Sequence, residues 1–192
     1  MKKLISLTLS AALCLGLFAG CGKQNAPATT ETTAPAYASS LEVLEKVWAT
    51  FPEEDRFPAA GGDEAHDTTD GPGAFDINAY GESFRYQTLV DENLTGKLTG
   101  DAATLIHMMN TNTFCSAVME LKNAGEASSF AEVYKEIVQG NHWMCGFPDT
   151  LVVLSLGNFV LTAYGADDLI QLFKSGAQSL GATLLVEAPA EA

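Results

Sequence analysis

The sequence has few cysteines and none of the short motifs that mark familiar active sites. Four cysteines occur in 192 residues, and no two of them form the CxxC pair that thioredoxin-type oxidoreductases use. The chain also lacks a GxSxG elbow, an HExxH zinc motif, a GxxxxGK[ST] phosphate loop and a GxGxxG turn. The sequence therefore gives no reason to expect an enzyme, and we predict a protein without a cofactor.

Basic residues are scarce as well. Ten lysines and arginines stand against 24 aspartates and glutamates, which gives a formal net charge of −14. Removal of an N-terminal segment with Lys2 and Lys3 would leave eight basic residues and a net charge of −16. So acidic a surface repels phosphate backbones and anionic lipid headgroups. We therefore exclude nucleic acid as a partner and a basic patch as the means of membrane attachment.

The first residues have the features of an export signal. A basic start precedes an apolar run from Leu4 to Leu17, which is shorter than a bilayer span of about 20 residues. Small residues stand directly before Cys21, as in the bacterial lipobox, although Phe18 occupies the position where that pattern usually has leucine. We predict that residues 1–20 are removed and that Cys21 carries diacylglycerol. The protein would then be anchored by lipid on the extracytoplasmic face of the cell membrane.

The rest of the chain divides into a tether and one domain. Residues 21–38 are rich in Pro, Ala and Thr and bury little apolar surface, so we predict a disordered tether. Residues 39–191 suit a single domain by their length. Within it, residues 39–112 would hold helices and an acidic loop, and residues 113–188 would form the core.

Apolar spacing predicts two helices in the first part of the domain. One begins at Ser39 or Ser40, where a capping box is present, and ends at Pro52. The other begins at Asp101 and runs through "AATLIHMM". The stretch between them is rich in Gly, Pro and acids and predicts a long irregular loop, in which residues 83–90 fit either a strand or a helix.

The second part of the domain alternates strands and helices. The strands are expected at residues 113–121, 150–156, 159–164 and 182–187, with the first half-buried. A capping box at Ser129 opens the first helix, acids at 167 and 168 open the second, and Gly157-Asn158 predicts a hairpin. This order is typical of a ferredoxin-like βαββαβ sandwich. We predict an α+β fold of that kind, with both helices on one face and additional N-terminal helices.

Cys115 and Cys145 are the cysteines left for the domain once Cys14 and Cys21 are set aside. Three interpretations stay open, namely buried structural thiols, a structural disulfide and a redox pair. A disulfide needs Cα atoms no more than about 7 Å apart, so a loop would have to fold over an intervening strand. A redox pair needs a resolving thiol close by, which this spacing does not supply locally.

Two sets of side chains offer metal ligands, and neither has a recognised spacing. The acidic loop suits Ca²⁺ by its chemistry but does not match an EF-hand, so we interpret it as a solvated loop. Its candidate ligands are Asp63, Glu64, His66, Asp67, Asp70 and Asp76. A second set would suit Cu(I). It comprises His107, Met108, Met109, Cys115, Met119, His142, Met144 and Cys145. We predict no metal site.

The stretch "GNHWMCGFPD", residues 140–149, contains three of these soft ligands and lies between a predicted helix and a predicted strand. Gly140 is a typical helix end, and Pro148 directs entry into the strand. Trp143 and Phe147 are expected to cover the end of the core. We interpret the stretch as a structural corner.

The segments "LIHMMNTNTF", "FPAAGGD" and "HWMCGFPDTLVVLSLGNFVLTAYG" resemble small exported lipoproteins of clostridial Firmicutes, some of which are labelled bacteriocin transport accessory protein. The C-terminal half is also similar to a Firmicutes lipoprotein domain of unknown function. The accessory-protein label elsewhere implies a thioredoxin-like oxidoreductase, whose CxxC this chain lacks. The resemblance therefore assigns no functional residues.

These features predict a non-enzymatic binding or accessory module of a cell-envelope or export system, with bacteriocin transport among the candidate processes. Its partners would be the membrane, through the lipid anchor, and a protein or peptide of the envelope. The alternatives are a thiol-redox accessory protein that uses Cys115 and Cys145, and a protein that binds soft metals.

Overall fold

The computed structural model describes residues 37–191. The predicted signal, Cys21 and most of the predicted tether lie outside these residues. The described residues belong to one compact unit. None of the helices in this unit is long and apolar enough to span a bilayer.

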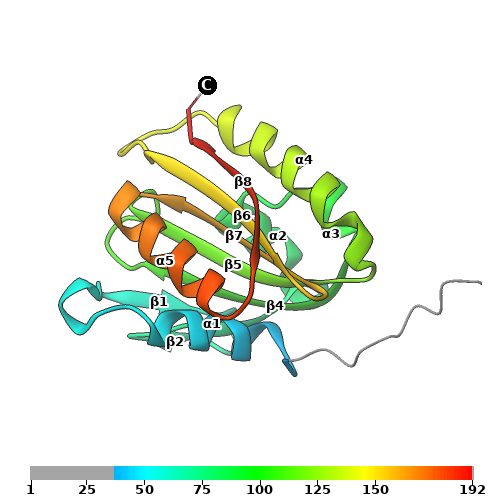
Figure 1. Cartoon of the computed structure of the whole chain (residues 1–192), viewed down its shortest axis with the longest axis horizontal. Coiled ribbons are helices and arrows are strands. Elements are labelled where there is room, and N and C mark those ends of the chain that lie inside the picture. The colour runs from blue at the N-terminus through cyan, green and yellow to red at the C-terminus, as the bar shows by residue number, and fades with distance from the viewer. Residues whose placement is uncertain (1–36, 192) are drawn as a thin grey trace, which may run out of the picture. The chain divides into compact units, whose positions relative to one another are not determined.

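An eight-stranded antiparallel sheet forms the middle of the fold (Figure 1). Its strand order is β2-β1-β4-β5-β7-β6-β8, and β3 also pairs with β4, beside β1. The strands are β1 (Ala59–Gly61), β2 (Thr68–Thr69), β3 (Gly73–Asp76), β4 (Leu98–His107), β5 (Phe114–Leu121), β6 (Thr150–Leu156), β7 (Phe159–Gly165) and β8 (Thr183–Pro189).

Helices cover both faces of this sheet. They are α1 (Ser40–Ala49), α2 (Ile77–Thr88), α3 (Glu92–Thr95), α4 (Ala127–Gln139) and α5 (Asp167–Ser179), with short 3₁₀ turns at Glu53–Asp55 and Ala124–Glu126. Residues of α2, α3 and α4 share one apolar cluster with the sheet, and residues of α1 and α5 share the other. The molecule is therefore an α+β protein with three layers, which confirms the predicted class.

The central strands explain the two clusters. On β5, Cys115, Ala117 and Met119 belong to the cluster beneath α4, while Phe114 and Val118 belong to the cluster beneath α5. Successive side chains of a strand point to opposite faces, so a strand covered on both sides is apolar at almost every position. The prediction that this strand is half-buried is wrong, because helices cover both of its faces.

The ferredoxin-like arrangement is not confirmed. The last strand, β8, pairs with β6, whereas the predicted topology would place it beside β5. That edge of β5 is occupied by β4. Two crossover connections contain these helices, β5-α4-β6 and β7-α5-β8. Their first strands, β5 and β7, are antiparallel, but both connections lead two strands further in the same direction across the sheet. Connections of one hand then place α4 and α5 on opposite faces, so the prediction of both helices on one face is wrong.

The N-terminal part differs most from its predicted elements. The first helix, α1, is confirmed, and the Ser39 hydroxyl accepts a hydrogen bond from the Glu42 N–H at 3.2 Å. The Glu42 carboxylate accepts a hydrogen bond from the Ala38 N–H, whereas in a standard capping box it would accept from the N–H of the N-cap residue, Ser39. The helix predicted from Asp101 is wrong. Those residues belong to β4, which is held on one side by β5 and on the other by β1 and β3.

The predicted irregular loop contains three short strands. β1 and β3 both pair with β4 and meet at two glycines. A Cβ on Gly61 would lie 2.2 Å from the Thr104 carbonyl oxygen and 2.4 Å from the Gly73 nitrogen. A Cβ on Gly73 would lie 2.5 Å from the Gly61 carbonyl carbon. Glycine is required because the two backbones touch where the strands meet.

The remaining elements settle the other predictions. Residues 83–90, which fitted a strand or a helix, mostly belong to α2. The capping box at Ser129 is wrong, because α4 begins at Ala127 and the Ser129 hydroxyl instead donates to the Glu126 carbonyl at 2.9 Å. The C-cap at Gly140, the hairpin at Gly157-Asn158 and the acid-started helix α5 are confirmed.

Candidate functional site

Asp63, the first acid of the acidic loop, is a structural residue. Its side chain is fully buried, and both carboxylate oxygens are occupied. One oxygen accepts hydrogen bonds from the Ala65 N–H at 2.9 Å and the His66 N–H at 3.0 Å, and it lies 2.8 Å from His66 Nδ1. The other accepts from the Asp76 N–H at 2.8 Å. Burial raises the pKa of Asp63, but the hydrogen bonds outweigh burial and hold the pKa below its ordinary value.

The other acids of this loop do not converge on a common point. Glu64, His66, Asp67 and Asp70 are exposed. Asp76, also exposed, caps α2 by accepting from the Asn78 N–H. Within residues 37–191, no three His, Cys, Asp or Glu side chains come together in a way that could hold a metal ion. The acids instead close a turn, cap a helix and face solvent.

The two cysteines of the domain lie in different surroundings. Both thiols are free, with Cys115 buried in β5 and Cys145 exposed in the loop between α4 and β6. Burial raises the pKa of the Cys115 thiol to about 12. Thiolate is the nucleophilic and metal-binding form of cysteine, so Cys115 is chemically inert in this environment.

The Cys115 thiol has a definite structural partner at the C-terminal end of α2. Cys115 Sγ donates to the Gln87 carbonyl at 3.1 Å, and the Tyr164 hydroxyl donates to the same oxygen at 3.2 Å. The Tyr134 hydroxyl donates to the Thr88 carbonyl at 3.0 Å. A helix leaves its last carbonyls without intrahelical partners, and here β5, β7 and α4 supply the donors. This cluster was not predicted from the sequence. Its only signal in the sequence is that β5, α4 and β7 each carry a polar group, the thiol or a tyrosine hydroxyl, among their buried apolar residues.

The 140–149 stretch is only partly the corner that the sequence predicts. Trp143 is half-buried and packs on Tyr164 with ring centroids 5.2 Å apart, as expected. Phe147 is 68% exposed, so the prediction that it covers the core is wrong. Of the candidate soft ligands, Cys115 and Met119 are buried in the core, whereas Met109 and Met144 are exposed. The structure therefore separates the buried Cys115 and Met119 from the exposed methionines.

Instead, an apolar surface forms at this end of the sheet. We call it the apolar end surface. Within the described residues, its members are all of the large hydrophobic side chains that are strongly exposed: Tyr86 (71%), Met108 (47%), Met109 (79%), Met144 (77%) and Phe147 (68%). They come from α2, from the β4–β5 turn and from the α4–β6 loop, three segments far apart in the sequence. Exposed apolar side chains that cluster in this way are typical of interaction surfaces.

Hydrogen bonds hold the two loops of the apolar end surface together. The Asn112 side-chain amide donates to the Met144 and Gly146 carbonyls, both at 3.0 Å, and the Asn110 amide donates to the Cys145 carbonyl at 3.1 Å. Tyr86 adjoins the β4–β5 turn because it lines the same hollow as Thr111. The exposed side chains therefore lie on neighbouring segments at one end of the fold.

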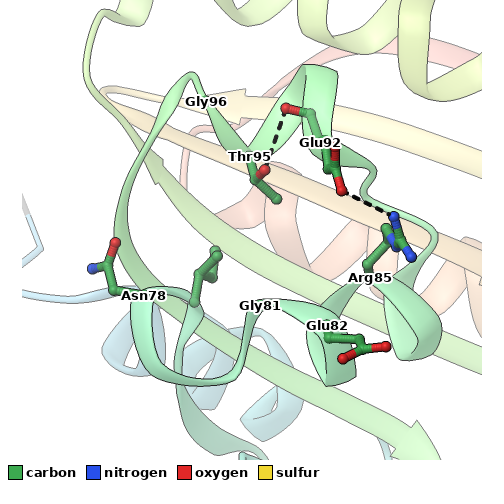
Figure 2. Close-up of a pocket in the computed structure, with 8 residues that line it drawn as sticks. Asn78, Gly81, Glu82, Arg85, Glu92, Thr95 and Gly96 are labelled. Atoms are coloured by element: carbon green, nitrogen blue, oxygen red, sulfur yellow. Dashed lines mark hydrogen bonds and ion pairs between the residues drawn. The ribbon is translucent and has the colours of Figure 1, made fainter.

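A separate cleft of about 550 Å³ lies between α2 and α3 (Figure 2). Its lining is polar and includes Asn78, Glu82, Arg85, Glu92 and Thr95. Arg85 Nη1 lies 3.3 Å from Glu92 Oε1, but the Glu92 side chain is 88% exposed. An ion pair in water contributes little and is easily exchanged. The cleft therefore presents a solvated surface without a buried functional group.

No protein-family model, curated protein or solved structure matches this chain.

Proposed function

We propose that this protein is a non-enzymatic, lipid-anchored binding module on the extracytoplasmic face of the cell membrane. It would serve a cell-envelope or export system, with bacteriocin transport as one candidate process. Acylation of Cys21 would supply the anchor, and the apolar end surface would bind a protein or peptide partner. The observation that carries this proposal is the gathering of Tyr86, Met108, Met109, Met144 and Phe147 at one end of the fold.

The position of this surface supports the proposal. The start of the described chain lies beside the N-terminal half of β4, where the Ser40 N–H donates to the Asp101 carboxylate at 2.7 Å. Met108 directly follows the last residue of β4. Met108 lies seven residue steps beyond Asp101, a length of about 23 Å at roughly 3.3 Å per residue. A chain anchored through its N-terminus would thus present the apolar end surface at the end of β4 away from Ser40.

The interior of the fold is consistent with a binding role. The buried groups that enzymes commonly activate are engaged in structure, as with the Cys115 thiol on the Gln87 carbonyl and the Asp63 carboxylate in its turn. The Cys115 thiol is enclosed in the core, and the Asp63 carboxylate, which lines the hollow beside Tyr86, has both oxygens occupied by hydrogen bonds. The large hydrophobic side chains that are strongly exposed lie instead at the apolar end surface, and apolar groups recognise rather than react.

A crosslinking experiment in intact cells tests the proposal. A photoreactive amino acid at position 144, 77% exposed in the wild type, should give one discrete adduct. The same amino acid at position 178, on an exposed face of α5, should not. Labelled palmitate should enter the protein and should be absent from a Cys21→Ser variant. Equal adducts at both positions, or no palmitate in the wild type, would contradict the proposal.

A further inference from the structure

We propose that the apolar end surface binds a positively charged amphipathic segment of a partner protein. This inference rests on the proposed binding function and names the chemistry of the partner. It depends on three properties of the surface, namely adaptable apolar side chains, flanking hollows with acidic groups, and an excess of acidic over basic groups. One cation lies beside it, because Arg85, which pairs with Glu92, also lies over the Tyr86 ring at 5.4 Å.

The apolar side chains are of an adaptable kind. Three of the five are methionines, which are unbranched and polarisable and can fill irregular gaps in a partner. They stand on loops that the Asn110 and Asn112 side chains hold, rather than on paired strands. Methionine-rich surfaces on movable loops typically accept the apolar face of an amphipathic helix.

Hollows lie on both sides of these loops, and each has an acidic group. A hollow of about 460 Å³ beside Tyr86 is lined by Glu64 and Gln87, and one of about 110 Å³ beside Phe147 is lined by Asp149. Glu64 and Asp149 are exposed, and within residues 37–191 neither forms an ion pair, although the Asp149 carboxylate accepts a hydrogen bond from the Asp167 N–H. An apolar strip between acidic groups is complementary to apolar side chains flanked by lysine or arginine.

An unpartnered acceptor lies beneath the larger hollow. Gln87 Oε1 is buried and, within residues 37–191, has no hydrogen-bond donor. The neighbouring main-chain carbonyl of Gln87 already accepts from Cys115 and Tyr164. Buried acceptors are normally paired. A lysine or arginine that entered this hollow would bring the donor that Gln87 Oε1 lacks.

Net charge distinguishes this partner from a bilayer or a second copy. Three of the ten basic residues and one of the 24 acids lie outside residues 37–191, which leaves seven against 23 and a formal net charge of −16. Five of the seven form ion pairs. Arg56 lies over Trp48, and Lys122 donates to the Gly96 carbonyl. Anionic headgroups and a second copy of the chain would both be repelled, whereas a cationic segment is attracted.

Binding of defined peptides tests the inference. The protein is the chain from residue 22 onward, which retains every described helix and strand and omits the acylated cysteine. The probe is a fluorescent peptide of about 18 residues, five helical turns, with leucines on one face and lysines on the other. Two controls are a scrambled peptide of the same composition and a peptide with glutamate in place of lysine. We expect the Leu/Lys helix to bind about tenfold more tightly than either control, and less tightly as salt is raised.

Two protein variants locate the binding. Met109→Lys with Met144→Lys places two cations on the apolar end surface at positions that are 79% and 77% exposed, so folding should be unaffected. Asn158→Lys with Gln178→Lys makes the same change of charge at exposed positions elsewhere. We expect about a tenfold loss of peptide affinity in the first variant and less than a twofold loss in the second. Equal losses in both variants would show that only net charge matters, and the inference would be wrong.

The remaining outcomes separate this inference from the proposed function. Binding to vesicles of phosphatidylglycerol and phosphatidylcholine, or a concentration-dependent dimer that Met109→Lys abolishes, would assign the surface to another occupant and overturn the inference. If the peptides fail but crosslinking from position 144 succeeds in cells, the binding function stands and the cationic partner is wrong. If both fail, the binding function is wrong as well.

Discussion

Two irregular regions of this molecule are held in opposite ways. The segment from Gly61 to Asp76 is rich in glycine and acids, yet its backbone touches itself at Gly61 and Gly73 and its Asp63 side chain is fully buried. The loops of the apolar end surface are rich in methionine and aromatic residues, yet these side chains face solvent. The first region is fixed by its own backbone and the second by two asparagine side chains. Backbone partners, rather than composition, decide which region is rigid.

The largest expected effect on stability comes from adding a side chain where the backbones of β1 and β3 touch. Gly61→Ala would place a methyl group 2.2 Å from the Thr104 carbonyl oxygen and 2.4 Å from the Gly73 nitrogen. Both atoms belong to the backbone of paired strands and cannot move aside. We expect the free energy of unfolding to fall by about 4 kcal/mol, measured by urea unfolding followed by tryptophan fluorescence.

Gly71→Ala is the matched control, in the same segment. Its added Cβ would meet only Trp48 Nε1, at 4.0 Å, and its φ angle is not in the left-handed region. We expect a change below about 0.5 kcal/mol. Equal stability of the two variants would show that the segment is as loose as its composition suggests.

A smaller loss is expected from Asp63→Asn. An asparagine keeps one acceptor but presents an NH₂ group to backbone N–H donors that the carboxylate now satisfies. We expect a loss of about 2 kcal/mol near pH 7, and almost none for the exposed Asp67→Asn.

The pH dependence of Asp63 follows from the direction of its pKa. Because the folded pKa is lowered, its contribution is complete above the ordinary carboxyl pKa and is lost as pH falls toward the folded value. The difference in stability between the wild type and Asp63→Asn should therefore shrink as the pH of the urea titration falls below about 4. A difference that is constant with pH would mean that the Asp63 charge is not stabilised.

The same distinction explains what the sequence could predict. In residues 113–189, alternating apolar residues and the Gly157-Asn158 turn carry local information, and these strands and helices are found. β4 was missed because its strand state depends on pairing with β5 and with β1 and β3, segments that lie elsewhere in the chain. The position of β8 depends on which edge of β5 is already occupied. Neither is a local property.

The apolar end surface was missed for a related reason. Met119 and Met109 are the same residue type, yet Met119 is completely buried and Met109 is 79% exposed. What differs is whether another element covers the position, and this is decided by the crossovers. Local hydrophobicity predicts that a side chain prefers burial but cannot show whether a cover exists.

Removing the hydrogen bonds between the β4–β5 turn and the α4–β6 loop should lower the free energy of unfolding only modestly. It should clearly increase the rate at which a protease cleaves the α4–β6 loop. Asn110→Ala with Asn112→Ala removes three hydrogen bonds to the backbone of residues 144–146. We expect a loss of about 1 kcal/mol and cleavage by chymotrypsin after Trp143 about fivefold faster. Asn158→Ala, in the β6–β7 turn, is the control. Unchanged cleavage would show that the loops are fixed by something other than these asparagines.

The smallest effect is expected from Cys145→Ser, below about 0.5 kcal/mol, because the residue is exposed and its thiol is free. Cys115 and Cys145 should react differently when the native protein is alkylated with iodoacetamide and its peptides are identified by mass spectrometry. Cys145 should be labelled, whereas Cys115, with a thiol pKa of about 12, should be labelled only after unfolding. A peptide that joins Cys115 to Cys145 in protein from the cell surface would break this contrast. It would require β5 to release its thiol from the Gln87 carbonyl, and the thiol-redox alternative would then gain the mobile cysteine that it needs.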